Sequence, residues 1–160
     1  MDKLGFGLVE IVVASAIISV SIFSLSAVSV IGNRLQSQSL EKIRANFLAE
    51  EGLEALRFLR DKSWNANLSS LSVGTNYYIS FASSTSQWNI GSTVAPNVDS
   101  FFERKITVEN VFRDSNDNID LSGGTQDPDT KKVSISVSWR DRNATTTINL
   151  STYLSDIFDN

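Results

Sequence analysis

The fold of this chain is decided by Ile11–Asn33, which reads IVVASAIISVSIFSLSAVSVIGN and contains no charged residue. As an α-helix with a rise of about 1.5 Å per residue, this stretch would be about 34 Å long. The hydrocarbon core of a membrane is roughly 30 Å thick, so the helix is long enough to cross it. The sequence therefore predicts an N-terminal membrane-spanning helix, and any soluble core must be built from the residues that follow.

The composition narrows the classes of function. The 160 residues include 14 Lys or Arg and 18 Asp or Glu, for a formal charge of −4, which predicts no broad positive surface for nucleic acid. The absence of cysteine excludes disulfides and thiolate chemistry, and the absence of histidine removes the commonest general base and transition-metal ligand. We therefore expect no enzyme activity, no cofactor and no metal site.

An acidic residue, Glu10, lies at the start of the apolar stretch. A carboxylate in the first turns of a membrane helix costs free energy unless it stays at the interface or finds a partner, so it is a functional candidate. A snorkelling interfacial side chain is the plainer interpretation. Two other interpretations of the N-terminus stay open, namely a plain membrane anchor and a secretory signal cut between Ser26 and Ala27.

Lys3–Glu10 reads KLGFGLVE and resembles the cleavage and methylation motif of type IV prepilins. In that family a glycine ends the leader, a phenylalanine begins the mature chain, and a glutamate precedes the apolar helix. The resemblance implies that a prepilin peptidase cuts after Gly5, that Phe6 becomes N-methylated, and that Glu10 acts in assembly. Gly7 stands where the family usually has threonine, outside these three roles.

The resemblance also implies partners and a location. The chain would cross the cytoplasmic membrane once, until pilus assembly machinery moves it into a cell-surface or periplasm-spanning filament of pilin subunits. There, the α-amine of Phe6 in a neighbouring subunit would pair with Glu10 and neutralise both charges. A type II secretion pseudopilin shares this chemistry. A membrane-anchored extracellular binding module that never polymerises is the alternative from another class.

Small residues in the apolar stretch share one side of the predicted helix. Ser15, Ser19, Ser26 and Ser29 fall on one stripe, interrupted by Ile22. Small residues allow helices to approach closely within a membrane. The stripe therefore predicts contact between subunit helices, with simple tolerance of serine as the alternative.

The helical pattern continues after Asn33 without proline to about Ser63. Apolar residues recur at spacings of three and four, which predicts an amphipathic continuation of the same helix. They form two rows: Leu40, Ile43 and Phe47, followed by Leu48, Gly52, Ala55 and Leu59. The stretch Ala45–Arg57 is also similar to a segment common in minor pilins and pseudopilins.

Alternating patterns after residue 63 predict a β-rich head. Val133–Trp139 and Ile148–Leu154 each alternate apolar and polar residues around a turn at Asp141–Ala144, which indicates an antiparallel hairpin with one buried face. Tyr77–Phe81 and Ile106–Val108 alternate over shorter lengths. We expect an α+β, pilin-like fold in which about four antiparallel strands cover the second half of the long helix.

Two features of the predicted head have competing interpretations. The segment Asp114–Asp129 is rich in Asp and Asn, which suits calcium, but it lacks the glycine and glutamate of an EF-hand loop, so a solvated loop from Asp114 to Thr130 is the preferred prediction. The three tryptophans, Trp64, Trp88 and Trp139, could form a sugar-binding platform on an adhesive tip, but core packing is the commoner use of tryptophan.

The predicted organisation has four parts. A leader at 1–5 precedes a hydrophobic transmembrane or filament-core helix at 6–33, an amphipathic helical continuation at 34–63 and a β-rich globular head at 64–160.

Overall fold

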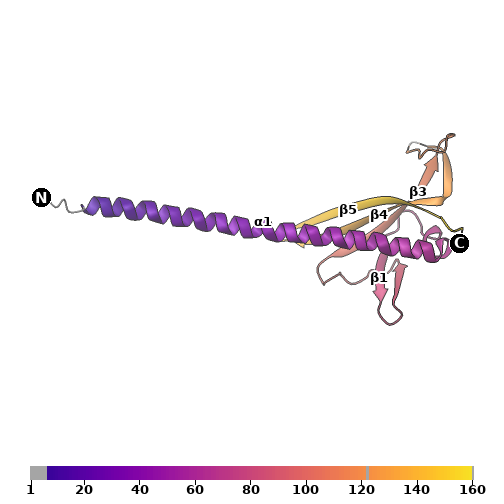
Figure 1. Ribbon diagram of the computed structural model, residues 1–160, viewed down its shortest axis with the longest axis horizontal. Coiled ribbons are helices and arrows are strands. Elements are labelled where there is room, and N and C mark those ends of the chain that lie inside the picture. The colour runs from indigo at the N-terminus through magenta and orange to yellow at the C-terminus, as the bar shows by residue number, and fades with distance from the viewer. Residues whose placement is uncertain (1–6, 122, 160) are drawn as a thin grey trace. The chain divides into compact units, whose positions relative to one another are not determined.

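A computed structural model describes residues 7–121 and 123–159 of the chain (Figure 1). The chain divides into two compact units, of which the first ends at Glu41 and the second begins at Lys42. One α-helix, α1, spans Leu8–Lys62 and therefore contributes residues to both units. The prediction of a single long helix is confirmed, and its observed end lies next to the predicted one.

The residues in the last turn of α1 are of a kind that stabilises a helix C-terminus. Arg60 and Lys62 lie in the last turn, where positive side chains interact well with the negative end of the helix dipole. A five-residue π-helical turn, Asn65–Ser69, begins three residues after Lys62, and Leu68 within it is buried. The sequence pattern did not predict this turn, because residues 64–70 show no regular apolar spacing.

The second unit contains two antiparallel sheets. The larger has the order β3-β4-β5, with β3 at Glu103–Arg113, β4 at Thr125–Asp141 and β5 at Ala144–Ser155. The smaller pairs β1, Tyr78–Ala82, with β2, Gln87–Gly91. The α+β fold class is confirmed, but in place of the expected group of about four strands the described residues form five strands in two sheets.

The hairpin of β4 and β5 follows the predicted pattern. Val133 faces Thr152 and Val137 faces Ile148, and the register is continuous down to Asp141 opposite Ala144. Val133, Ile135 and Val137 are completely buried, while the serines between them are partly exposed. The period-two alternation therefore assigned the buried face of β4 correctly.

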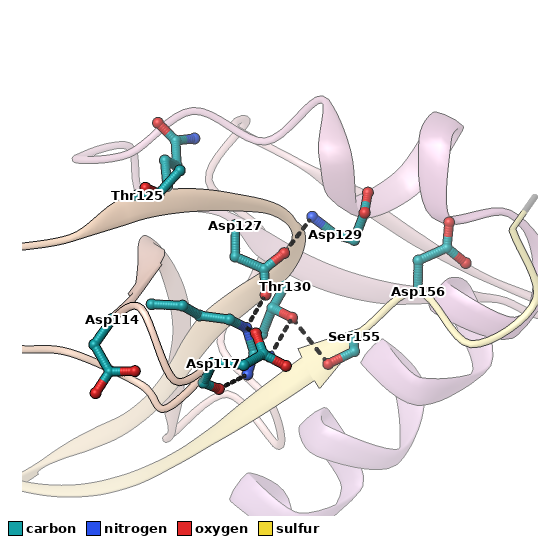
Figure 2. Close-up of a pocket in the computed structure, with 10 residues that line it drawn as sticks. Asp114, Asp117, Thr125, Asp127, Asp129, Thr130, Ser155 and Asp156 are labelled. Atoms are coloured by element: carbon teal, nitrogen blue, oxygen red, sulfur yellow. Dashed lines mark hydrogen bonds and ion pairs between the residues drawn. The ribbon is translucent and has the colours of Figure 1, made fainter.

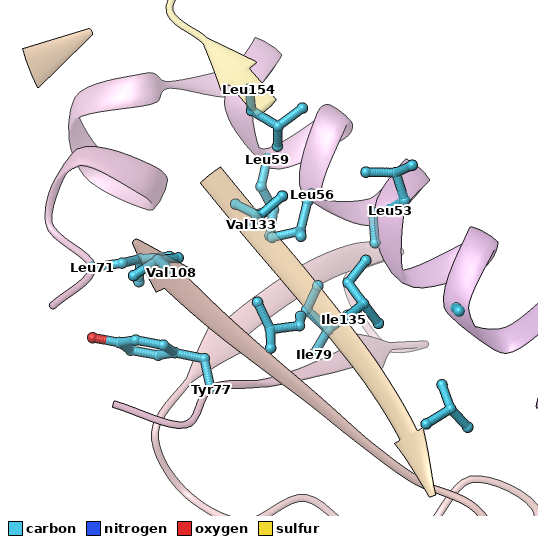
Figure 3. Packing of buried hydrophobic residues seen from close by; sticks show 14 of the residues in the cluster. Leu53, Leu56, Leu59, Leu71, Tyr77, Ile79, Val108, Val133, Ile135 and Leu154 are labelled. Carbon is cyan, nitrogen blue, oxygen red and sulfur yellow. The ribbon is translucent and has the colours of Figure 1, made fainter. Parts of the chain in front are cut away.

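The core lies between the larger sheet and the Lys42–Lys62 part of α1 (Figure 3). Leu53, Leu56 and Leu59 face the inner side chains of the sheet, and Gly52 lies where the helix comes close to it. A Cβ atom at Gly52 would be 3.2 Å from Arg104 Cδ and 3.4 Å from Ile135 Cγ2. Glycine at this position therefore permits the close approach of helix and strand.

A buried cation joins β3 to α1. Arg104 is 7% exposed, and its Nη1 donates hydrogen bonds to the Leu48 carbonyl at 3.0 Å and to Glu51 Oε2 at 2.8 Å. Its guanidinium carbon lies 5.9 Å from the centre of the Trp88 ring. Within the described residues its Nε has no hydrogen-bond partner. This charge thus links the helix, the larger sheet and β2.

One expectation about α1 and two about the head need correction. In α1, Ile43 and Phe47 are at least half exposed, because the sheet covers the row that begins at Leu48. Phe81 is 52% exposed, whereas Tyr77 and Ile79 in the same predicted alternation are buried. The expected loop to Thr130 ends earlier, since β4 begins at Thr125 and pairs with the end of β3.

Candidate functional site

The sequence places the candidate site at the start of α1. Gly5 and Phe6, the predicted cleavage and methylation residues, lie outside the described residues. Gly7 and Glu10 are described, with Gly7 directly preceding the first helical residue, Leu8. The structure therefore shows the surroundings of only one of the three predicted site residues.

Glu10 caps its own helix. Its Oε2 accepts a hydrogen bond from the backbone N–H of Gly7 at 2.8 Å, and its own N–H donates to the Gly7 carbonyl at 3.0 Å. A glutamate at the third helical position that reaches back to the N-cap N–H forms half of a capping box. A negative charge here also interacts favourably with the positive end of the helix dipole. Glu10 therefore has a structural role within the single chain, which the sequence pattern did not indicate.

Four serines of the apolar stretch satisfy their hydroxyl groups inside the helix. Ser15 Oγ donates to the Val12 carbonyl at 2.8 Å, Ser19 to Ser15 at 2.7 Å, Ser21 to Ile17 at 2.8 Å and Ser24 to Val20 at 2.8 Å. A hydroxyl bonded to the preceding turn needs no partner from water. These serines are therefore compatible with an apolar environment and leave small surfaces for a neighbouring helix.

The apolar part of α1 is long enough to cross a membrane, and within the part of the chain that the structure describes its most apolar window contains no buried residue. Val20, Phe23 and Val30, for example, are 66%, 77% and 69% exposed. Exposed apolar area of this extent costs free energy in water, so the segment requires lipid or other protein around it. The structure thus supports an N-terminal helix capable of single-pass membrane anchoring.

The acidic segment of the head surrounds an arginine in an open hollow of about 470 Å³ (Figure 2). Arg113 Nε donates to Asp127 Oδ2 at 2.6 Å, and its Nη1 donates to the Asp117 carbonyl at 2.9 Å. Asp114 Oδ1 accepts the backbone N–H groups of Asn116 and Asn118. Within the described residues, no three His, Cys, Asp or Glu side chains are grouped so as to hold a metal ion. An internal cation thus neutralises part of the acidic segment.

The hydrogen bonds of this hollow change the pKa values of its charged groups. Burial raises the pKa of Asp127, but hydrogen bonds from Arg113, the Thr130 hydroxyl and the Asp129 N–H lower it more, so the net pKa lies below its ordinary value. The pKa of Asp114 is also lowered, first by the Asn118 N–H. The sequence did not indicate the partnership of Arg113 and Asp127, because β3 and β4 bring them together across a loop.

The lowered pKa of Asp127 predicts a pH dependence of stability. A carboxylate whose folded pKa lies below its unfolded value of about 3.9 stabilises the fold above that value, and the contribution is lost as the pH falls through the folded pKa. We expect Asp127→Asn to lower the free energy of unfolding at pH 7, with the difference from the original chain shrinking in acid. Urea unfolding of the full chain in detergent, followed by tryptophan fluorescence at several pH values, measures this.

The partner residue supplies the control for this pH dependence. In an Arg113→Met background, the effect of Asp127→Asn should be much smaller, because the largest of the interactions that lower the pKa of Asp127 is gone. An unchanged effect of Asp127→Asn in that background, or a difference that does not vary with pH, would contradict this explanation.

The tryptophans divide between core and surface. Trp64 and Trp139 are only 2% and 3% exposed, which accords with core packing. Trp88 is half-buried and lies edge-on to Phe81, with ring centres 5.2 Å apart. The three tryptophans therefore do not form one exposed platform.

Comparisons of the chain with models of known protein families, with curated proteins and with solved structures found no match.

Proposed function

We propose that this chain is a structural subunit of a type IV pilus or a related pilus-like filament, and not an enzyme. Prepilin peptidase would cut after Gly5, Phe6 would be methylated, and the apolar part of α1 would leave the cytoplasmic membrane to pack against other subunits. The observation that best supports this proposal is the long apolar part of α1, whose most apolar window contains no buried residue among those described, directly after the motif Gly5–Glu10.

The physical argument is that this surface fits two apolar environments in turn. Lipid covers it before assembly, and the helices of other subunits would cover it in the filament. The internally bonded serines avoid a desolvation cost in either environment. A type II secretion pseudopilin would use the same helix in the same way, so it belongs to the same proposal.

The proposal is tested by the mature N-terminus. Intact mass and N-terminal sequencing should be measured on protein recovered from cells that contain a prepilin peptidase. We expect a chain that begins with methylated Phe6. A chain that still begins at Met1 would favour the anchored binding module, and a chain cut before Ala27 would favour a secreted domain.

Glu10 is proposed to pair with the α-amine of Phe6 in a neighbouring subunit. The pair would neutralise two charges that are costly in an apolar filament core. Glu10→Leu should therefore permit cleavage but strongly reduce incorporation into filaments, measured by quantitative immunoblotting of sheared filaments against the total membrane fraction.

A matched variant separates charge pairing from helix capping. Glutamine can also accept the hydrogen bond from the Gly7 N–H that Glu10 accepts in this chain, but it carries no charge. We expect Glu10→Gln to be incorporated as poorly as Glu10→Leu. Normal incorporation of Glu10→Gln would instead assign the importance of Glu10 to capping.

A further inference from the structure

The larger sheet has one unprotected edge. β5 is the last strand in the order β3-β4-β5, and within the described residues no further strand pairs with its outer side. All twelve of its residues pair with β4 in one continuous register. The opposite side of β5 therefore presents backbone N–H and C=O groups along its full length, as a template for another strand.

β5 lacks the features that usually prevent strand addition. Its sequence, ATTTINLSTYLS, contains no charged residue and no proline, and its register shows no bulge. The other outer strand, β3, is different. It contains five charged residues, its register shifts between Asn110 and Val111, and Ile106 is bridged by Tyr77 through two backbone hydrogen bonds of 2.8 Å. Protection is thus confined to one edge of the sheet.

The apolar face of the sheet is also incomplete at β5. Val133, Ile135 and Val137 of β4 are fully buried, but Ile148 and Leu150 of β5 are only partly buried. A strand added beyond β5 would cover these two side chains. Backbone pairing and apolar burial would therefore occur together.

We propose that the outer edge of β5 pairs with β5 of a second copy of this chain, in antiparallel orientation about a two-fold axis through Asn149. In this register Ile148 of one copy faces Leu150 of the other on the inner side of a continuous sheet. Isologous pairing makes each such contact twice.

The charges that flank β5 favour this occupant and this orientation. Arg142 lies in the turn before β5 and Asp156 directly follows the strand. In the antiparallel register centred on Asn149, Arg142 of one copy is opposite Asp156 of the other. Parallel pairing would place identical charges together at both ends. The uncharged strand between them allows two copies to approach despite the net charge of each chain.

The orientation of the pair determines where it would form. β5 runs in the same direction as the Lys42–Lys62 part of α1. Toward one end, Ile148 pairs with Val137, Val137 pairs with Arg104, and Arg104 donates a hydrogen bond to the Leu48 carbonyl. Toward the other end, Leu154 and Leu59 belong to the same buried cluster and are drawn close together in Figure 3. Antiparallel pairing therefore points these helix segments in opposite directions. Subunits of one filament all point in the same direction. If the proposed function holds, the antiparallel pair would therefore connect two filaments. The self-pairing of β5 does not itself depend on that function.

Single cysteines test the register directly, because the chain has no cysteine of its own. Thr145→Cys, Asn149→Cys and Tyr153→Cys should be compared in the full, uncut chain in detergent under mild oxidation. We expect disulfide-linked dimers to be most abundant for Asn149→Cys, since only at the two-fold axis does a residue face itself. Equal cross-linking at the three positions, or none at Asn149→Cys, would overturn the proposal.

Added positive charge on β5 provides a second test of the proposed dimer. In the proposed register Thr147 of one copy faces Ser151 of the other, so Thr147→Lys/Ser151→Lys would oppose lysines twice per dimer and weaken dimerisation about tenfold or more. The control Ser83→Lys/Ser84→Lys adds the same charge in the exposed β1–β2 turn and should dimerise like the original chain. The measurement is mass against concentration by analytical ultracentrifugation in detergent. A chain that stays monomeric at every concentration would overturn the proposal. Dimers that persist in Thr147→Lys/Ser151→Lys would also overturn it, because association would then be assigned to α1.

Discussion

Gly5→Ala is expected to leave the chain uncut, so that full-length precursor beginning at Met1 accumulates in the membrane and no filament-associated protein is recovered. The resemblance to prepilins implies that the peptidase accepts only a residue without a side chain at this position. The expected loss is therefore close to complete. Intact mass and a shift in electrophoretic mobility, measured with and without a co-expressed prepilin peptidase, report the uncut fraction.

Gly7→Ala is the matched control for this prediction. It makes the same change two residues away, at a position outside the three proposed roles. A Cβ atom at Gly7 would have only Glu10 Oε2 within 4 Å, at the ordinary contact distance of 3.9 Å. We expect Gly7→Ala to be cut normally. Normal maturation of Gly5→Ala would require the prepilin assignment to be abandoned.

Leu56→Ala is expected to have the second large effect, by lowering the free energy of unfolding of the head by about 3 kcal/mol. Leu56 is completely buried between α1 and the larger sheet. Its truncation removes apolar contacts and leaves a cavity that a long, rigid helix cannot close. Urea unfolding of the full chain in detergent can be followed by fluorescence, because Trp64 and Trp139 are buried in the same core.

Phe47→Ala is the control, since it removes a larger apolar side chain from the same helix. Phe47 is 66% exposed and lies outside the buried cluster. The change should alter the free energy of unfolding by no more than about 0.5 kcal/mol. A similar loss for the two variants would mean that the head packs against a different face of α1.

Local patterns correctly predicted the long helix and the β4–β5 hairpin of this chain. The apolar stretch and the absence of proline predicted one helix to about Ser63, and alternation predicted the hairpin around Asp141–Ala144. The motif at Gly5, Phe6 and Glu10 supplies the functional proposal. These predictions depend on residues close together in the sequence, where periodicity and turn chemistry act directly.

Partners distant in the sequence were not predictable in the same way. Nothing in the local sequence pairs Arg104 with Glu51 or Arg113 with Asp127, because each pair forms only when the strands are in place. Likewise, no local signal divides the five strands into two sheets. Hydrogen-bonded charge pairs need a defined geometry, and the spacing of residues along the sequence does not specify that geometry.

The two apolar rows of α1 show most clearly what the sequence decides and what the tertiary structure decides. The sequence by itself determined that Ile43 and Phe47, like Ala55 and Leu59, lie on a helix, since spacing alone defines a helical face. Only the tertiary structure decided that the sheet covers Ala55 and Leu59 and leaves Ile43 and Phe47 at least half exposed. The physical reason is that helical periodicity is a local property, whereas burial requires a partner surface, which β4 provides from about half the chain away.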